Sequence, residues 1–243
     1  MAKIPNKIHW CWLSNDPLPD NVREIFLPSW KKMGEDYEIK LWNTENFDIR
    51  MTPKFIRDAY DDKHYAMVSD YIRAYAVYME GGWYFDSDIE IKRPFPEEWR
   101  NHNLCATFEA TEYGSLLLSC LDDEGKNKTG VPIWGAGINT AMFGGVAKLK
   151  YLYDVMAFYN TLDYSKLDYE YTLLGRYIAP QIYSFVAEKY GYKYDNSIGT
   201  IDDDMFIAPE ILVTNVPYSR HNNLAYAHHH CNFGWGNKIP SKK

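Results

Sequence analysis

The sequence lacks the features that mark several large classes of protein. Its four cysteines are widely spaced and form no C-x-x-C pair, so we expect buried free thiols rather than a zinc site or a disulfide framework. No segment approaches the roughly 20 apolar residues of a membrane span. The first ten residues, "MAKIPNKIHW", hold no long apolar stretch, so no signal peptide is expected. These absences predict a cytoplasmic protein without a transmembrane span.

Positive charge is also scarce. The net charge is −7 and no long basic run occurs, so nucleic acid is not expected as a partner, because phosphate contacts need clustered lysine and arginine. The chain has 243 residues, of which 46% are hydrophobic, enough to form a sizeable buried core. No internal repeat and no linker is visible, so we expect one domain over residues 1–243.

Aromatic residues, in contrast, are abundant. They make up 16% of the chain, with 21 tyrosines and 8 tryptophans. They can fill a core, or they can form a surface that stacks on the rings of bases or sugars. Composition does not separate these two interpretations.

The first half of the chain alternates between strand and helix patterns. Residues 7–12 alternate in the manner of a strand, residues 21–34 are weakly helical and end at Gly34, and residues 37–43 form a second strand. A helix is predicted from Asp61 to Met79, followed by two glycines and a short, fully apolar strand, "WYF". Strand, helix and strand in succession favour an α/β fold with a parallel sheet.

The second half is less regular. A glycine-bounded strand is expected over residues 135–145, helices over 146–160 and 177–191, and one or two strands over 201–213. The tail, residues 225–238, is predicted to be a loop.

Asp86 and Asp88 follow the apolar strand with one serine, Ser87, between them. In an extended chain, residues two apart point to the same face. The two carboxylates therefore repel each other unless a cation lies between them. Oxygen ligands of this kind suit magnesium or manganese, which could neutralise a bound diphosphate. A hydrated acidic turn is the alternative, but the carboxyl end of a central strand is where α/β sheets bind ligands.

Two other groups of side chains carry possible chemistry. The histidines 228–230 include good manganese ligands, with a surface cluster as the alternative. Asp70 and Arg73 are three residues apart on a predicted helix, and by themselves they indicate no more than a surface ion pair.

The segment "SDYIRAYAVYMEGGWYFDSDIE" resembles the glycosyltransferase family named for its D-x-D sugar-binding motif, which includes capsular polysaccharide transferases and outer-chain mannosyltransferases. It is more distantly similar to the glucosyltransferase domains of clostridial toxins. The family pattern S-D-x-x-R…G-G-x-Y-x-D-x-D is matched by eight residues, namely Ser69, Asp70, Arg73, Gly81, Gly82, Tyr84, Asp86 and Asp88. The opening "IPNKIHWCW" and the late "HHCNFGW" also resemble the family, and the strong resemblance covers roughly residues 1 to 100.

The resemblance implies a GT-A fold, with a central, mostly parallel sheet flanked by helices as in Rossmann-like proteins. It also implies a nucleotide-sugar donor, a divalent metal and retention at the anomeric carbon. Asp88, Asp86, His229 and His230 are the expected metal ligands, and Asp70, Arg73, Asp86 and Asn139 the expected catalytic residues. Contacts to the donor are expected from Ile8, His9, Trp10, Trp12, Ser69, Tyr84, Ser87 and Trp235.

We therefore expect a metal-dependent retaining glycosyltransferase that uses Mn²⁺ (or Mg²⁺). The donor would be uridine-linked rather than guanosine-linked, and the acceptor a glycan or a lipid-linked saccharide, in capsular or surface polysaccharide assembly. Peripheral association with the inner face of the membrane stays open. A nucleotide-sugar hydrolase that uses the same site and a non-catalytic sugar-binding module are the alternatives.

Overall fold

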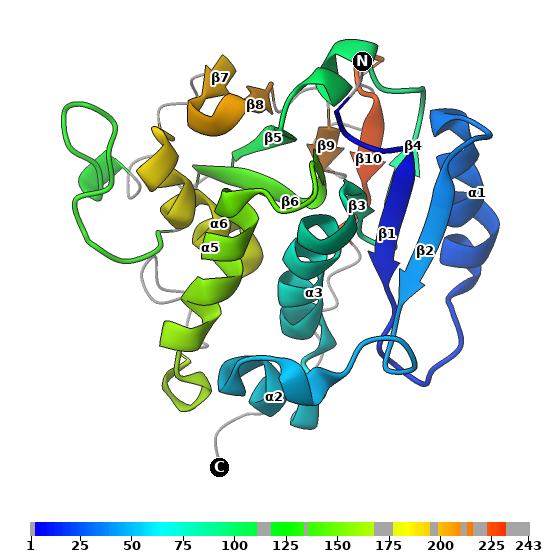
Figure 1. The fold of residues 1–243 in the computed structure, drawn as a ribbon, viewed down its shortest axis with the longest axis horizontal. Helices are drawn as coiled ribbons and strands as arrows, with labels where there is room; N and C mark the ends of the chain where they lie inside the picture. Colours follow the sequence, from blue (N-terminus) through cyan, green and yellow to red (C-terminus); the bar gives the residue numbers. More distant parts are fainter. Residues whose placement is uncertain are drawn as a thin grey trace.

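A seven-stranded sheet forms the centre of the protein (Figure 1). The computed structural model describes residues 3–110, 118–133, 136–167, 177–194, 199–209, 213–215 and 223–231. Across the sheet the strands follow the order β2 (Glu38–Trp42), β1 (Lys7–Cys11), β3 (Gly82–Phe85), β6 (Ala136–Gly145), β5 (Leu104–Ala110), β8 (Met205–Ala208) and β7 (Gly199–Ile201).

The sheet is mostly parallel, as expected. β1 pairs in parallel with β2 and β3, and β5 pairs in parallel with β8. β6 is antiparallel to both β3 and β5, and β7 is antiparallel to β8, so β6 and β7 run against the other five. The carboxyl ends of β1, β2 and β3 therefore meet at one edge of the sheet, which lies beside α2 (Lys54–Asp61) in Figure 1.

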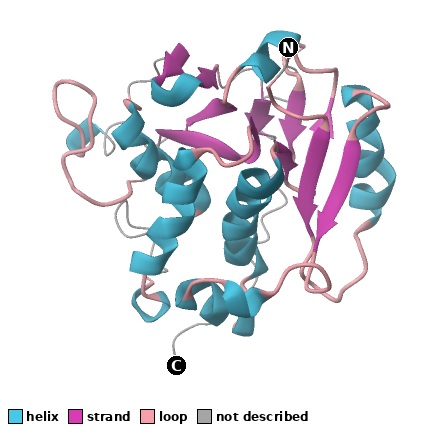
Figure 2. Cartoon of the chain, viewed as in Figure 1, coloured by secondary structure: helices cyan, strands magenta, loops and turns pink. Residues whose placement is uncertain are grey.

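Helices cover one face of the sheet. α3 (Tyr65–Glu80), α5 (Lys150–Phe158) and α6 (Ala179–Ala187) lie side by side against it (Figure 2). Their apolar side chains meet those of alternate strand positions, such as Tyr84 and Phe143, in one core cluster. The expected helices over 146–160 and 177–191 are thus confirmed, and Gly191 ends the second with a φ of 85°.

The opposite face is covered by a different layer. It consists of a helical segment, in which a π-helical turn (Val22–Phe26) leads into α1 (Leu27–Ser29) and a 3₁₀ turn (Trp30–Met33), and of a small second sheet. Trp83 and Phe85 point into this second core cluster, so β3 is buried on both faces. The prediction that its apolar sequence makes it an interior strand is confirmed.

The small sheet corrects the prediction for the tail. β10 (Ala227–His229) is a strand rather than a loop, and it lies between β4 (Ile89–Ile91) and β9 (Val213–Asn215). It is antiparallel to β4 and parallel to β9. A run of histidines has no apolar alternation, so its strand conformation comes from backbone pairing with remote segments, which local pattern does not reveal.

The start of the long helix was also predicted wrongly. α2 ends at Asp61, and α3 begins only at Tyr65, because Lys63 adopts a left-handed φ of 61° between them. The predicted end is confirmed, since Gly81 and Gly82 have φ values of 66° and 106°. A Cβ on Gly82 would lie 2.6 Å from the carbonyl oxygen of Lys7, so only glycine lets β3 pass this close to β1.

Short 3₁₀ turns complete the described elements. They span Ile49–Met51, Glu97–Asn101, Tyr159–Thr161, Tyr164–Lys166, Glu188–Tyr190 and Asp202–Asp204. Among the described residues, none of the helices combines the length and the apolar character that a membrane crossing requires.

His9, on β1, ties the sheet to the end of α3. Its Nε2 lies 2.8 Å from the carbonyl oxygen of Gly81, and its Nδ1 accepts a hydrogen bond from the indole nitrogen of Trp42 at 3.0 Å. Nδ1 accepts and Nε2 therefore carries the proton, so the ring is neutral. Burial lowers the pKa of His9 to about 4.

We expect this histidine to make stability depend on pH. Between pH 6.5 and about 4, His9 of the unfolded chain takes up a proton that His9 of the folded chain does not. The contribution of His9 to the free energy of unfolding is therefore fully present above pH 6.5, and it is lost as the pH falls to about 4. The difference amounts to about 3 kcal/mol. Denaturant unfolding of the wild type and His9→Gln across this range isolates the effect, because all other groups titrate in both proteins. Parallel pH profiles for the two would contradict the prediction.

Candidate active site

The D-x-D pair lies at the carboxyl end of β3, between the two sheets. The backbone nitrogen of Asp86 donates to the carbonyl oxygen of Ala141 at 2.7 Å, and that of Ile89 donates to the carbonyl oxygen of Asp86 at 3.0 Å. The first bond extends the pairing of β3 with β6 by one residue, and the second closes a turn into β4. Asp86, Ser87 and Asp88 are half-buried on this turn, so a rigid interior strand fixes the position of both carboxylates.

Arg73 is the centre of the polar network behind the pair. Its guanidinium lies 2.8 Å from Oδ1 of Asp70 and 3.2 Å from Oδ1 of Asp86. It also donates to the carbonyl oxygen of Thr140 at 2.8 Å and lies over the ring of Tyr84. Burial lowers the pKa of Arg73, but the two carboxylates outweigh this effect and raise it, so the guanidinium stays charged. Sequence alone indicated a surface ion pair, whereas this arginine is buried and joins α3 to the D-x-D motif.

Asp70 is held by α6 as well as by Arg73. The backbone nitrogen of Ala179, the first residue of α6, donates to its Oδ2 at 3.1 Å, and the Tyr183 hydroxyl donates to its carbonyl oxygen at 3.1 Å. Burial raises the pKa of Asp70 to about 7, although Arg73 opposes the shift. Because its side chain is only 3% exposed, Asp70 needs both partners to carry a charge there.

Three side chains could together hold a metal ion. One ligand atom each of Asp86, Asp88 and His229 lies within 4.8 Å of the others, and Nε2 of His229 is 3.4 Å from Oδ1 of Asp88. Burial raises the pKa of Asp86, Arg73 opposes this, and Asp88 adds to it. Two carboxylates and one imidazole fit Mn²⁺, whereas Mg²⁺ prefers oxygen ligands alone.

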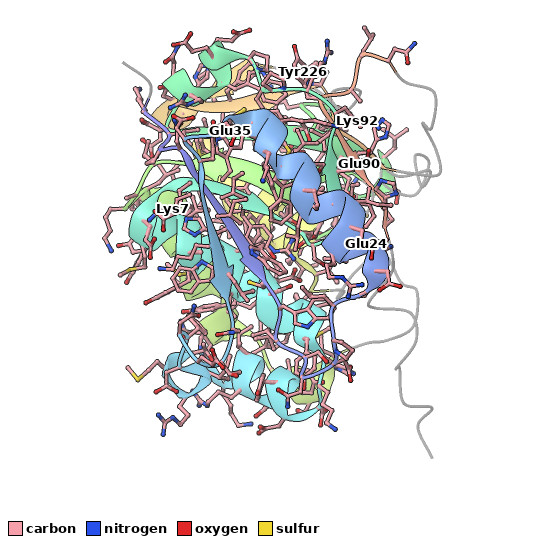
Figure 3. The ribbon with its side chains drawn as sticks, turned by 90° about the vertical axis from the view of Figure 1, so that its right-hand side faces the viewer. Lys7, Glu24, Glu35, Glu90, Lys92 and Tyr226 are labelled. Atoms are coloured by element: carbon pink, nitrogen blue, oxygen red, sulfur yellow. The ribbon has the colours of Figure 1, made fainter. Side chains whose placement is uncertain are left out.

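His230 lies apart from this group. Its Nε2 is 3.0 Å from Oε2 of Glu90, and its ring packs against Phe26 on the helical segment. Glu90 also pairs with Lys92, and Figure 3 shows both on the same side of the molecule. His230 directly follows β10 and its backbone nitrogen still pairs with the carbonyl oxygen of Asp88 at 3.1 Å, and successive residues of extended chain point to opposite faces.

Three other residues that the sequence predicts to contact the sugar donor, or to act in catalysis, lie near the network around Arg73. Ser69 and Tyr84 join the network, since Ser69 Oγ accepts from Arg73 at 3.2 Å and the Tyr84 hydroxyl donates to Oδ1 of Asp86 at 2.9 Å. Asn139 is buried on β6, where its Oδ1 accepts from the backbone nitrogen of Ala141 at 3.0 Å.

The predicted residues of the first strand point mainly inward. Ile8 and Trp10 are buried in the core that contains Trp30. His9 is buried too, with its ring nitrogens engaged by Gly81 and Trp42. Trp12, just beyond the strand, is half-buried, and its indole donates to the carbonyl oxygen of Asp16 at 3.0 Å. Trp235 lies outside the described residues. Contact of these side chains with a nucleotide stays a prediction.

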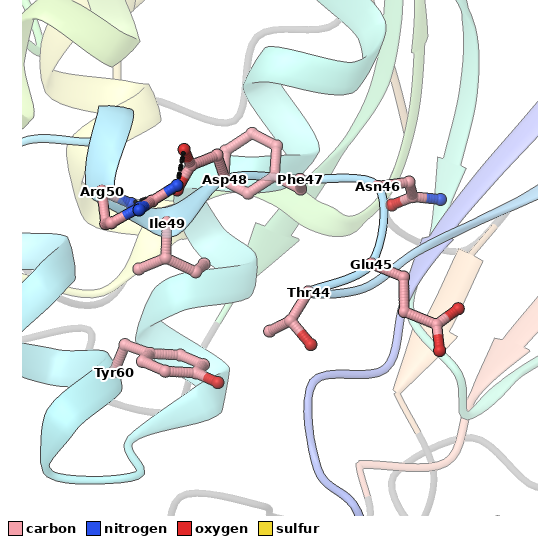
Figure 4. A pocket seen from close by; sticks show the side chains of 8 residues that line it. All are labelled: Thr44, Glu45, Asn46, Phe47, Asp48, Ile49, Arg50 and Tyr60. Atoms are coloured by element: carbon pink, nitrogen blue, oxygen red, sulfur yellow. Dashed lines mark hydrogen bonds and ion pairs between the residues drawn. The ribbon is translucent and has the colours of Figure 1, made fainter.

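A cavity of about 570 Å³ opens near the carboxyl ends of the parallel strands β1, β2 and β3 (Figure 4). It follows the carboxyl end of β2 and is lined by residues 44–50 together with Tyr60 of α2. Arg50 and Asp48 form a two-pronged ion pair across its wall, with contacts of 2.8 Å and 2.7 Å. None of the predicted donor residues is among those that line it.

Sequence reasoning missed four contributors to the site. Thr140 accepts from Arg73 through its carbonyl oxygen and, at 3.2 Å, through its side-chain Oγ1. Ala179 acts through a backbone nitrogen, which carries no sequence signal, and Tyr183 is one of many tyrosines. Cys231 lies beside His229, with its Sγ 3.5 Å from Nδ1. The sequence predicts a buried free thiol at Cys231, whereas this free thiol is half-buried beside a metal-site histidine, a position that its adjacency to the histidine run could have indicated.

Residues 19–106 match the model of a family described as the glycosyltransferase sugar-binding region containing the DXD motif. The resemblance seen in the sequence is thereby confirmed for this segment, and it points to a glycosyltransferase. A relative from Legionella pneumophila strain Philadelphia 1, "Subversion of eukaryotic traffic protein A", is 28% identical over 123 residues. The alignment covers 40% of this chain, and the chain spans only about a fifth, 19%, of that relative.

Solved structures share the fold at low sequence identity. The PaToxG glycosyltransferase has a TM-score of 0.51 at 11% identity, over 76% of this chain and 69% of its own. Mouse xyloside xylosyltransferase 1, in its apo form, has a TM-score of 0.50 at 12% identity, over 93% of this chain and 98% of its own. The expected GT-A type of α/β fold is therefore confirmed.

Proposed function

We propose that this protein is a metal-dependent glycosyltransferase that moves a sugar from a nucleotide-sugar donor to an acceptor with retention at the anomeric carbon. The observation that carries the proposal is the convergence of Asp86, Asp88 and His229 at the carboxyl end of a buried strand, directly in front of buried Arg73. A carboxylate–imidazole site beside a fixed cation suits a diphosphate leaving group.

The metal would act as a Lewis acid on the diphosphate of the donor. Asp88 and His229 would bind it from β4's leading turn and from β10, and Asp86 would contribute its carboxylate from the end of β3. Asp86 follows β3 of the large sheet, whereas Asp88 precedes β4 and His229 ends β10, which are paired in the small sheet. This backbone pairing would position all three ligands before a metal binds.

The network behind the metal site would orient the donor sugar. Asp86 and Asp70 can accept hydrogen bonds from sugar or ribose hydroxyls, and Arg73 can donate to hydroxyls or to phosphate. The Tyr84 hydroxyl and the guanidinium both bind Oδ1 of Asp86, which fixes that carboxylate in one orientation. A charged, pre-positioned network of this kind does not have to reorganise as the glycosidic bond breaks.

The finer parts of the proposal come from the sequence resemblance. They are a uridine-linked donor, a glycan or lipid-linked acceptor, and a role in capsular or surface polysaccharide assembly. Within this proposal Asn139 and Trp12 would contact the donor, since one lies on β6 beside Thr140 and the other follows β1.

A calorimetric screen of nucleotide sugars with Mn²⁺ tests the proposal. We expect one donor class to bind only when Mn²⁺ is present, and its sugar to be transferred to a saccharide acceptor with the anomeric configuration unchanged, as NMR of the product would show. Release of free sugar at the same rate without acceptor would favour the hydrolase. If no nucleotide sugar binds with Mn²⁺, the proposed function fails.

A further inference from the structure

The imidazole of His229 lies between a carboxylate and a thiol. Its Nε2 faces Oδ1 of Asp88 at 3.4 Å, on the side of the three-residue group. Its Nδ1 faces Sγ of Cys231 at 3.5 Å, and the same Sγ lies 3.6 Å from the carbonyl oxygen of His229. Both ring nitrogens of this histidine therefore have defined neighbours.

The backbone around Cys231 is built to place the thiol there. β10 ends at His229, and the backbone nitrogen of His230 then donates to the carbonyl oxygen of Asp88 at 3.1 Å. At the next residue the chain turns sharply, because Cys231 adopts a left-handed φ of 48°. This conformation is unfavourable for a residue other than glycine, and here it accompanies the approach of Sγ to within 3.5 Å of Nδ1 of His229.

The two sulfur contacts are chemically consistent with each other. The thiol hydrogen can be donated to the carbonyl oxygen of His229, which leaves a sulfur lone pair to accept from Nδ1–H. With its proton on Nδ1, the ring can present the lone pair of Nε2 to a metal. Histidine ligands generally need a partner of this kind to fix the tautomer and the ring orientation.

We propose that Cys231 is a positioning residue for the metal site: it accepts a hydrogen bond from Nδ1–H of His229 and so aims Nε2 at Asp86 and Asp88. This inference rests on the metal site of the proposed function. It assigns to the thiol a role that is neither redox nor nucleophilic.

The first test is Mn²⁺ affinity, measured by electron paramagnetic resonance of the free ion. Cys231→Ala should raise the dissociation constant about tenfold or more, the usual effect of losing such a partner. Cys231→Asn should bind nearly as the wild type does, because asparagine tolerates the left-handed conformation and its amide oxygen accepts from Nδ1–H. Cys120→Ala removes another free thiol and serves as the control.

The second test observes the hydrogen bond itself in the metal-free protein. The Nδ1–H proton of His229, assigned by comparison with His229→Gln, should exchange slowly with water in the wild type and in Cys231→Asn, and rapidly in Cys231→Ala. If Cys231→Ala does not fold, Cys231→Gly, which favours the positive φ, replaces it. Unchanged affinity, or weakened affinity with unchanged exchange, would overturn the inference. A wild type that binds no Mn²⁺ would refute the metal site, while the exchange rates would still decide the Cys231 contact.

Discussion

Asp88→Ala is expected to abolish metal-dependent donor binding and to lower turnover about a thousandfold or more. That factor corresponds to about 4 kcal/mol, within the several kcal/mol that a metal supplies to a developing charge. Asp88 contacts His229 directly, so its loss removes one ligand and leaves the imidazole without its carboxylate partner. Calorimetry of the donor with and without Mn²⁺ measures the binding effect.

Asp86→Ala should be less damaging than Asp88→Ala, because the pair of Asp88 and His229 stays intact and Oδ1 of Asp86 is already engaged by Tyr84 and Arg73. Asp204→Ala is the matched control. It removes an aspartate that pairs with Lys3 and His102 at the start of β8, the amino-terminal edge of the parallel strands. Wild-type, manganese-dependent turnover in Asp88→Ala would end the main hypothesis.

Arg73→Met should lower the free energy of unfolding by about 3–5 kcal/mol, the cost of removing one partner from a buried charged network. The variant leaves Asp70 buried without its counter-charge and deprives Thr140 of a hydrogen bond. Arg73→Lys keeps the charge but loses the fork that reaches Asp70, Asp86 and Thr140 together, so its loss should be intermediate. Denaturant unfolding measures both variants.

Arg50→Met is the control for this second prediction. Arg50 makes a two-pronged pair with Asp48, but its side chain is 87% exposed, so its removal should leave stability nearly unchanged. Equal losses in Arg50→Met and Arg73→Met would mean that burial of the network does not matter. The activity of Arg73→Met should also fall, since Asp86 loses the cation that orients it.

The fold was predictable where its elements are set by local pattern. Trp83 and Phe85 alternate with Tyr84 on a strand without polar residues, which marks an interior strand, and the glycines before it mark the end of a helix. β10 and the break at Lys63 were not predictable in this way. One depends on backbone pairing with remote strands, and the other on a single left-handed residue.

The candidate site also combines features that local sequence predicts with features that depend on contacts between distant segments. The spacing of Asp86 and Asp88 indicated a shared face, and the structure brings them together with His229. The sequence did not distinguish His229 from His230, because their separation depends on the extended backbone at the end of β10, which the sequence does not predict. The contact of Ala179 with Asp70 joins residues 109 positions apart through a backbone nitrogen, so no side-chain motif reports it.

The most direct test of the central claim is a titration of the protein with uridine diphosphate in the presence and absence of Mn²⁺, carried out in parallel on the wild type and His229→Ala. Our account predicts that Mn²⁺ strengthens nucleotide binding at least about tenfold in the wild type and has little effect in His229→Ala, because Asp86, Asp88 and His229 would hold the ion that neutralises the diphosphate. Nucleotide binding that is equally strong with and without Mn²⁺, or a manganese effect that survives in His229→Ala, would contradict it.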